Sequence, residues 1–280
     1  MKQVFCVLLA LVLVAASLTA FAEDTLYFSE QPFGFTAAEY PLELEGRKVY
    51  GVLYLPEGDG PFPTIIFSHG FNGSEGSWAH VAKILANSGF ACYAFDFRGG
   101  NTLKRSSGKT TEMSALTEKA DLTEVMHLIQ REAFCDPSRL YLAGESLGGL
   151  VTVLTAAEFP EEVAGVFLIY PALTVPETTR QQYASEDDIP ARPRFSGVAI
   201  GKQFYTDVMD IDINQALDAY PGSILILHGD ADALVSMEAV QEIAAWHAQC
   251  AFVIMPGEGH GFTPEGKTET AKQLYQFCTK

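Results

Sequence analysis

The chain has 280 residues, of which 48% are hydrophobic, and its formal net charge at pH 7 is -17. This length and hydrophobic content suit one α/β domain with a sizeable core, and they exclude an intrinsically disordered protein. A chain this acidic is repelled by the phosphates of nucleic acids, so we expect no nucleic acid partner.

The first residues have the pattern of a secretory signal peptide. Lys2 supplies the positive charge, residues 4–16 are apolar, and residues 20–22 have the small-x-small form of a cleavage site. A membrane anchor is the alternative, but the apolar stretch is too short to span a bilayer comfortably. We therefore predict a signal peptide over residues 1–22, cleavage after Ala22, and a secreted or periplasmic protein without a stable membrane span.

Four cysteines follow the predicted cleavage site: Cys92, Cys135, Cys250 and Cys278. Export permits disulfides, and four cysteines allow three pairings. A domain of this size does not need such cross-links, and Cys92 lies in an apolar strand pattern that is typical of a buried thiol. The sequence therefore predicts no particular disulfide.

Strands and helices alternate along the first part of the chain. Residues 42–55 alternate around a Gly turn, which predicts an antiparallel hairpin at a sheet edge. Residues 64–67 are continuously apolar, as expected for a strand buried on both faces. Strands separated by helices predict right-handed βαβ units in a parallel sheet. The further strands are expected at 91–95, about 140–145 and 163–169, with helices at about 77–88, around 122–129 and at 147–159.

The alternation stops at residue 171. Up to about residue 213 the chain has several prolines and charges but no visible core strand. One interpretation is a surface excursion. We favour a lid over a pocket, because so long a segment is seldom a plain loop and it leaves the fold beside the expected catalytic edge. Its aromatic residues, the candidates for substrate binding, are Tyr183, Phe195, Phe204 and Tyr205. The sheet then resumes with strands at 223–227 and 251–255 and helices at about 237–247 and 269–278.

The motif G-x-S-x-G spans residues 144–148. The apolar run before it is typical of a buried strand, and the Leu-, Val- and Ala-rich run after it is typical of a helix. A serine on such a sharp strand-to-helix turn projects above the sheet. The alternative is an ordinary connection whose serine caps the helix. In this context the motif predicts Ser146 as a catalytic nucleophile.

A serine nucleophile needs a base, and the sequence contains six histidines. His260 lies in a Gly-rich loop after the last predicted strand, where flanking glycines let the ring swing over Ser146. In this type of fold the base also follows the nucleophile in the chain. We therefore predict His260 as the base. His228 is expected to shape the acidic turn that follows it, and three others fall within predicted helices: His80, His127 and His247.

The base needs an acid that orients it, and this acid should follow the preceding strand. Asp230 and Asp232 both do. Asp232 lies deeper in the loop, where it can reach Nδ1 of His260, whereas Asp230 is expected to bond turn amides, as short acidic side chains often do. The prediction is therefore Asp232.

Two backbone N–H groups should stabilise the oxyanion of the tetrahedral intermediate. One is the N–H of Leu147, directly after the nucleophile. The other should come from the loop after the first parallel strand, residues 68–73, where Gly70 lets the backbone turn inward. We predict the N–H of Phe71 as this donor and a hydrogen-bonding role within the loop for His69.

With these motifs the chain resembles serine hydrolases of the α/β-hydrolase superfamily, and among them the bacterial cinnamoyl (feruloyl) esterases. The motifs are those at residues 69–73, 95–100, 144–148, 228–232 and 259–261. The resemblance implies a mostly parallel sheet with helices on both faces and an insertion after the sixth strand that lines the acyl pocket, which fits residues 171–213. Those esterases usually carry His before and Gln after the nucleophile, where this chain has Glu145 and Leu147.

The sequence thus predicts a secreted serine carboxylesterase, and the resemblance implies hydroxycinnamoyl esters of small molecules or polysaccharides as its substrates. The alternatives are a small-acyl esterase, a serine peptidase of the same superfamily, and a non-catalytic module that kept the fold. We expect no metal or cofactor, because no His, Cys, Asp or Glu cluster has the spacing of metal ligands.

Overall fold

The structure is a computed structural model that describes residues 19–20 and 25–280. Of the predicted signal peptide, only strand β1 (Thr19–Ala20) falls within the described part. The rest of residues 1–22, and the predicted cleavage point after Ala22, lie outside the described residues. Within the described ranges, no helix is long and apolar enough to cross a membrane.

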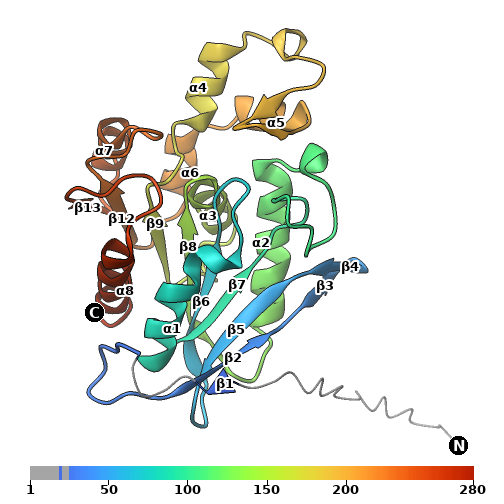
Figure 1. Cartoon of the computed structure of the whole chain (residues 1–280). Helices are drawn as coiled ribbons and strands as arrows, with labels where there is room; N and C mark the ends of the chain where they lie inside the picture. Colours follow the sequence, from blue (N-terminus) through green and yellow to red (C-terminus); the bar gives the residue numbers. More distant parts are fainter. Residues whose placement is uncertain (1–18, 21–24) are drawn as a thin grey trace, which may run out of the picture.

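A nine-stranded sheet forms the centre of the molecule (Figure 1). All neighbours from β7 to β13 in the spatial order pair in parallel, whereas β5 runs antiparallel to both its neighbours. The prediction of a mostly parallel sheet is therefore confirmed. In spatial order the strands after β1 are β2 (Phe35–Glu39), β5 (Gly51–Pro56), β7 (Ala91–Phe95), β6 (Phe62–Ser68), β8 (Cys135–Glu145), β9 (Gly165–Ile169), β12 (Ile224–Gly229) and β13 (Cys250–Met255).

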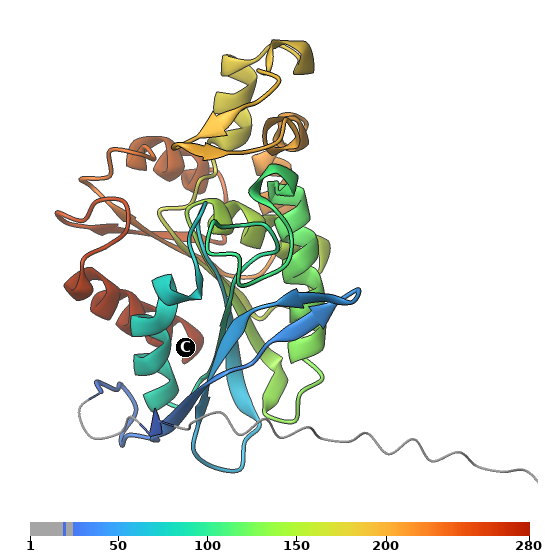
Figure 2. The ribbon, with the colours of Figure 1, turned by 45° about the vertical axis from the view of Figure 1, so that its right-hand side comes forward.

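Helices cover both faces of this sheet (Figure 2). Helices α1 (Ala79–Asn87) and α8 (Pro264–Cys278) pack together on one face, and α2 (Ala115–Ile129) and α3 (Leu147–Glu158) pack together on the other. The core on the α2 and α3 side also takes in buried residues of α6 (Ile213–Ala219) and α7 (Met237–Ala245).

Strand β6 contains the predicted apolar run at residues 64–67, and it lies between two hydrophobic cores. Ile65 and Phe67 belong to the core under α1 and α8, and Ile66 belongs to the core under α2 and α3. All three side chains are fully buried. Because successive side chains of a strand point to opposite faces, a strand covered on both faces has to be apolar throughout.

The structure departs from the predicted elements near the N-terminal edge. The predicted hairpin over residues 42–55 is split: β3 (Leu42–Leu44) and β4 (Arg47–Val49) form a two-stranded sheet of their own, and only β5 joins the large sheet. The sequence analysis missed β2, whose Thr-Ala-Ala centre shows no apolar alternation. Its strand conformation comes from pairing with β5, which a local pattern does not reveal.

The last helix is longer than predicted. It begins at Pro264, not near residue 269. The side chain of Thr263 accepts a hydrogen bond from the N–H of Gly266, and proline is favoured at the first helical position, so the helix has a proper N-cap there.

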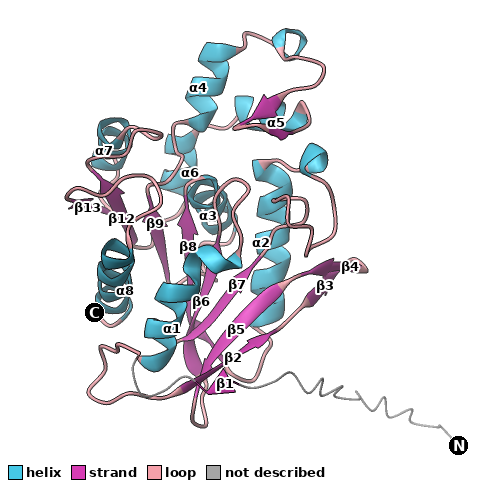
Figure 3. Cartoon of the chain, in the orientation of Figure 1, coloured by secondary structure: helices cyan, strands magenta, loops and turns pink. Residues whose placement is uncertain are grey.

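Residues 171–213 contribute no strand to the large sheet, as predicted. They form a separate layer beyond the carboxyl ends of the parallel strands (Figure 3). We call residues 171–213 the insertion. It consists of α4 (Val175–Gln182), η3 (Glu186–Asp188), the short hairpin of β10 (Arg194–Phe195) and β11 (Val198–Ala199), and α5 (Gln203–Met209).

The insertion is fixed to the body by hydrogen bonds to the segment before α2. Ser114 Oγ donates to Asp207 Oδ2 at 2.6 Å, and Thr110 Oγ1 donates to the carbonyl of Ala199 at 2.8 Å. Ser114 is itself the N-cap of α2, so α5 is attached where that helix begins.

All four cysteines of the described chain have free thiols: Cys92, Cys135, Cys250 and Cys278. Cys92 is fully buried in β7, as its apolar strand pattern predicts.

Candidate active site

The G-x-S-x-G motif forms a strained turn between β8 and α3. Ser146 follows the last residue of β8 and has φ 51° and ψ −122°, in a region that non-glycine residues rarely adopt. The neighbouring glycines leave the space this turn needs: a Cβ at Gly144 would lie 2.3 Å from the carbonyl oxygen of Gly148, and a Cβ at Gly148 would lie 2.5 Å from that of His69. The predicted turn is therefore present, with a partly exposed serine at its tip.

Three predicted residues from distant parts of the chain meet at this turn. His260 Nε2 lies 3.0 Å from Ser146 Oγ, and His260 Nδ1 lies 2.8 Å from Asp232 Oδ2. The Asp232 side chain is fully buried, whereas 21% of the His260 side chain is exposed. With Nδ1–H donating to the carboxylate, Nε2 is left to accept the serine hydroxyl hydrogen, which is the geometry of a Ser-His-Asp triad.

Asp232 is held by the turn that it begins. Its Oδ1 accepts hydrogen bonds from the N–H groups of Leu234 at 2.8 Å and Val235 at 3.0 Å, which leaves Oδ2 for His260. Burial raises the pKa of Asp232, but the hydrogen bonds from these N–H groups and from His260 lower it by more. The resulting pKa lies below its usual value. The carboxylate therefore stays ionised opposite the imidazole.

The two neighbours of Asp232 take the places that the sequence predicts. Asp230 Oδ1 accepts from the N–H of Gly257 at 2.6 Å, which is a turn amide. His228 Nε2 lies 3.1 Å from the carbonyl oxygen of Val235 and 3.3 Å from Asp232 Oδ2. Burial lowers the pKa of His228, so its neutral ring donates one N–H within the turn and does not compete as the base.

The two predicted oxyanion donors flank Ser146. The N–H of Leu147 is the first of α3 and so has no acceptor within the helix. Phe71 lies on the loop after β6, which approaches Ser146 closely: a Cβ at Gly70 would lie 2.9 Å from the Cβ of Ser146. The N–H of Asn72 holds this loop by donating to the carbonyl of Gly100 at 3.1 Å.

The side chain of His69 holds the same loop with two hydrogen bonds. Its Nδ1 donates to the carbonyl of Gly70 at 2.7 Å, and its Nε2 accepts from the N–H of Phe97 at 3.1 Å. The ring is fully buried, and burial lowers its pKa. Nδ1 is therefore used within the loop, and Nε2 ties the loop to the segment after β7, in agreement with the predicted hydrogen-bonding role.

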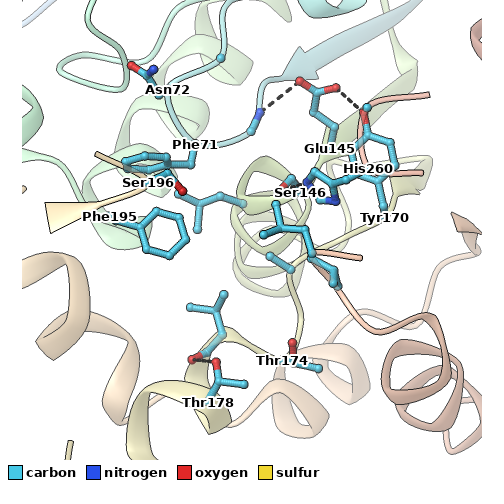
Figure 4. Close-up of a pocket in the computed structure, with 18 of the residues that line it drawn as sticks. Phe71, Asn72, Glu145, Ser146, Tyr170, Thr174, Thr178, Phe195, Ser196 and His260 are labelled. Atoms are coloured by element: carbon cyan, nitrogen blue, oxygen red, sulfur yellow. Dashed lines mark hydrogen bonds between the residues drawn. The ribbon is translucent and has the colours of Figure 1, made fainter. Parts of the chain in front are cut away.

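A cavity of about 520 Å³ opens above Ser146, between the body and the insertion (Figure 4). Three of the four aromatic candidates line it: Phe195, Phe204 and Tyr205. Tyr183 is not among the lining residues. Its ring packs edge-on against Tyr205 with centroids 5.0 Å apart, so it supports the wall from outside.

One wall of the cavity is polar, which the sequence analysis did not anticipate. Thr174, Thr178 and Gln182 line it at intervals of four residues along α4. This spacing places them on one face of a helix, but the face is recognisable only once the helix itself is known. The sequence analysis also noted Glu145 only as a departure from a family pattern; in the structure it is a lining residue with two hydrogen bonds (Figure 4).

Among the residues that the structure describes, no group of three or more His, Cys, Asp or Glu side chains is placed to hold a metal ion.

The chain is similar in sequence and in fold to known proteins. A model of the family "Serine aminopeptidase, S33" matches residues 59–186, which include Ser146 but end before Asp232 and His260. The structure of Est1E from Butyrivibrio proteoclasticus with ferulic acid bound is similar, with a TM-score of 0.76 and 23% identity, over 86% of this chain and 99% of that chain.

Two curated proteins give further likeness in sequence. The uncharacterized protein YfhR of Escherichia coli O157:H7 is 22% identical over 245 residues, 85% of this chain and 77% of that protein. Cutinase est2 of Thermobifida alba is 27% identical over 116 residues, 41% of this chain and 37% of that protein. The chain has the α/β-hydrolase fold, and the predicted resemblance to α/β-hydrolase esterases of the feruloyl type is confirmed.

Proposed function

We propose that this protein is a secreted serine esterase that hydrolyses carboxylic esters through an acyl-enzyme. The observation that carries the proposal is the hydrogen-bonded series Ser146–His260–Asp232 at the floor of a cavity of about 520 Å³. A nucleophile, a base within reach and an acid that orients the base are what acyl transfer at neutral pH requires.

In the proposed reaction the Ser146 hydroxyl oxygen attacks the ester carbonyl carbon while its proton passes to His260 Nε2. The N–H groups of Phe71 and Leu147 stabilise the oxyanion that forms, and the buried charge of Asp232 stabilises the imidazolium. His260 then gives the proton to the departing alkoxide, leaving the acyl group on Ser146. A water molecule, deprotonated by the same imidazole, attacks this ester; the bond to Ser146 Oγ breaks, the imidazolium returns the proton to Oγ, and the acid is released.

The shape and chemistry of the cavity favour an aromatic acyl group. Phe195, Phe204 and Tyr205 provide flat apolar surface, and the α4 wall offers hydroxyl and amide groups to polar substituents at the far end of such a ring. Ferulic acid, which is bound in the similar structure of Est1E, is an aromatic acid with polar ring substituents. We therefore propose hydroxycinnamoyl esters, of small molecules or attached to polysaccharides, as the substrate class.

Two alternatives use the same triad. A small-acyl esterase would leave most of the cavity unfilled. A peptidase is the activity that the description of the matching family names, and it would cleave amides at the same serine.

A panel of substrates separates these possibilities. We expect methyl ferulate to be hydrolysed with a kcat/KM about ten- to two-hundredfold above that of methyl acetate, because burial of the ring contributes to transition-state binding. Higher kcat/KM on methyl acetate would assign a small-acyl esterase, and faster cleavage of an aminoacyl p-nitroanilide than of any ester would assign a peptidase. No activity on any substrate in the panel would favour the remaining alternative, a non-catalytic module that kept the fold.

A further inference from the structure

Glu145 is a buried carboxylate directly before the nucleophile. Only 9% of the residue is exposed, and in the described part of the chain no Lys or Arg side chain forms an ion pair with it. Burying a charge without a cationic partner is costly unless hydrogen bonds compensate it. The two bonds that compensate Glu145 both lead into the active site.

The first bond reaches the loop that carries the proposed oxyanion donor. Gly70 donates its N–H to Glu145 Oε1 at 3.3 Å (Figure 4). Gly70 directly precedes Phe71, whose N–H is the proposed donor. The carboxylate is therefore fixed at the end of β8 and sets how closely this loop approaches Ser146.

The second bond reaches the surface against which the catalytic imidazole lies. Tyr170 donates its hydroxyl hydrogen to Glu145 Oε2 at 2.9 Å. The ring of Tyr170 contacts that of His260, with centroids 4.5 Å apart, and that of Phe262, with centroids 4.9 Å apart. Tyr170 also has φ 36°, so its backbone is held in an unfavourable region at the end of β9. Burial, followed by the charge of Glu145, raises its pKa, which keeps the phenol protonated as a donor.

We propose that Glu145 is a positioning residue that connects the two halves of the catalytic machinery, holding the Phe71 N–H through Gly70 and the His260 ring through Tyr170. This inference rests on the proposed esterase function. Without Glu145, the donor loop and the imidazole lose their common support, while the Ser146–His260–Asp232 hydrogen bonds and the aromatic wall of the cavity remain. The effect should therefore fall on the transition state and not on substrate binding.

Three variants test the connection: Glu145→Ala removes both bonds, and Tyr170→Phe removes one and keeps the ring on His260. Glu145→Gln can keep both contacts without the charge, because its amide oxygen can accept from the Gly70 N–H while its amide N–H donates to the Tyr170 hydroxyl oxygen. We expect Glu145→Ala to lower kcat on p-nitrophenyl acetate about ten- to a hundredfold, the range for small misplacements of reacting groups, with KM within about twofold. Tyr170→Phe should lower kcat less, and Glu145→Gln should recover most of the loss.

A second readout separates positioning from general damage. Phenylboronic acid, which adds to a serine hydroxyl as a tetrahedral boronate, should lose affinity for Glu145→Ala in proportion to the loss of kcat. The matched control for the phenol is Tyr220→Phe, which removes a buried hydroxyl that donates to the carbonyl of Val163 at 3.0 Å and lies outside the cavity lining. We expect this control to lower Tm and leave kcat unchanged.

The proposal is overturned if Glu145→Ala keeps kcat within twofold, if its loss appears in KM with unchanged boronate affinity, or if Glu145→Gln is as slow as Glu145→Ala. The last result would assign the effect to charge. Failure of the proposed function has a different signature: hydrolysis that does not depend on Ser146, or no hydrolysis by the wild-type protein at all.

Discussion

The ring of Phe71 lies edge-on against the ring of Phe195, with centroids 4.8 Å apart and an angle of 86° between the planes. Phe204 completes the cluster at 5.4 Å from Phe71. Phe71 belongs to the loop proposed to donate the oxyanion N–H, and Phe195 and Phe204 belong to the insertion. The insertion therefore does more than line the cavity: it packs directly against the residue that carries the donor.

This packing predicts an effect of the insertion on substrates too small to fill the cavity. Phe195→Ala should lower kcat on p-nitrophenyl acetate about tenfold, because Phe71 loses a packing partner and small displacements of a donor are costly. Steady-state kinetics measures this. Tyr183→Ala is the matched control, since Tyr183 lies in the same insertion but outside the cavity lining, and its kcat on the acetate should equal that of wild type. An unchanged acetate kcat in Phe195→Ala would reduce the role of this ring to lining the cavity.

The two aspartates of the β12 loop should differ sharply when replaced. Asp232→Asn should lower kcat at neutral pH by about 10⁴, as in the serine protease precedent, because the amide favours the wrong imidazole tautomer. Asp230→Asn should mainly lower Tm, because it weakens the bond to the Gly257 N–H. Kinetics and thermal unfolding of both variants would decide, and the reverse pattern would make Asp230 the acid.

A buried carboxyl in α2 predicts how stability depends on pH. Glu118 is 1% exposed, and neither of its side-chain oxygens has a hydrogen-bond partner among the described residues. Burial, with a further contribution from Asp121, raises its pKa well above 4.5. The protonated group therefore contributes stability that is full below pH 4.5 and is lost as pH rises toward the folded-state pKa.

Glu118→Gln should remove this dependence. We expect the Tm of the variant to exceed that of wild type by about 2–4 °C for each kcal/mol gained in the free energy of unfolding. This difference in Tm should grow between pH 5 and pH 8. The control is Glu161→Gln, which makes the same exchange at an exposed position and leaves Glu118 in place. A Glu118→Gln variant that is less stable than wild type at pH 8 would show that the ionised carboxylate has a compensating partner.

Export can be tested on the protein itself. If the signal peptide covers residues 1–22, the protein recovered outside the cytoplasm of a bacterial host should start at Glu23, and its intact mass should match residues 23–280. A protein that keeps its first 22 residues and stays in the cytoplasm would contradict the prediction.

The proposed triad was predictable because its chemistry follows chain order and strand ends. Ser146 has a local motif whose glycines are sterically required. Asp232 could be distinguished from Asp230 because it lies further along the loop after the strand, within reach of His260. In the structure Asp232 contacts His260, and Asp230 accepts from the N–H of Gly257, as expected.

Other features depend on contacts between distant residues and left no local pattern. Strand β2 is defined by its pairing with β5, and the position of Tyr183 behind Tyr205 depends on how α4 packs on α5. The connection through Glu145 joins Gly70 and Tyr170, which lie 75 residues before it and 25 residues after it in the chain. Sequence alone shows only an unusual acid beside the nucleophile.

The most direct test of the account is the hydrolysis of p-nitrophenyl acetate by wild type and Ser146→Ala, with circular dichroism to show that both are folded. The account predicts that the alanine variant loses serine-dependent turnover and keeps only the contribution of the oxyanion hole and binding, about 10³–10⁴ over water. An alanine variant that is folded and retains a tenth of the wild-type kcat would show that Ser146 is not the nucleophile.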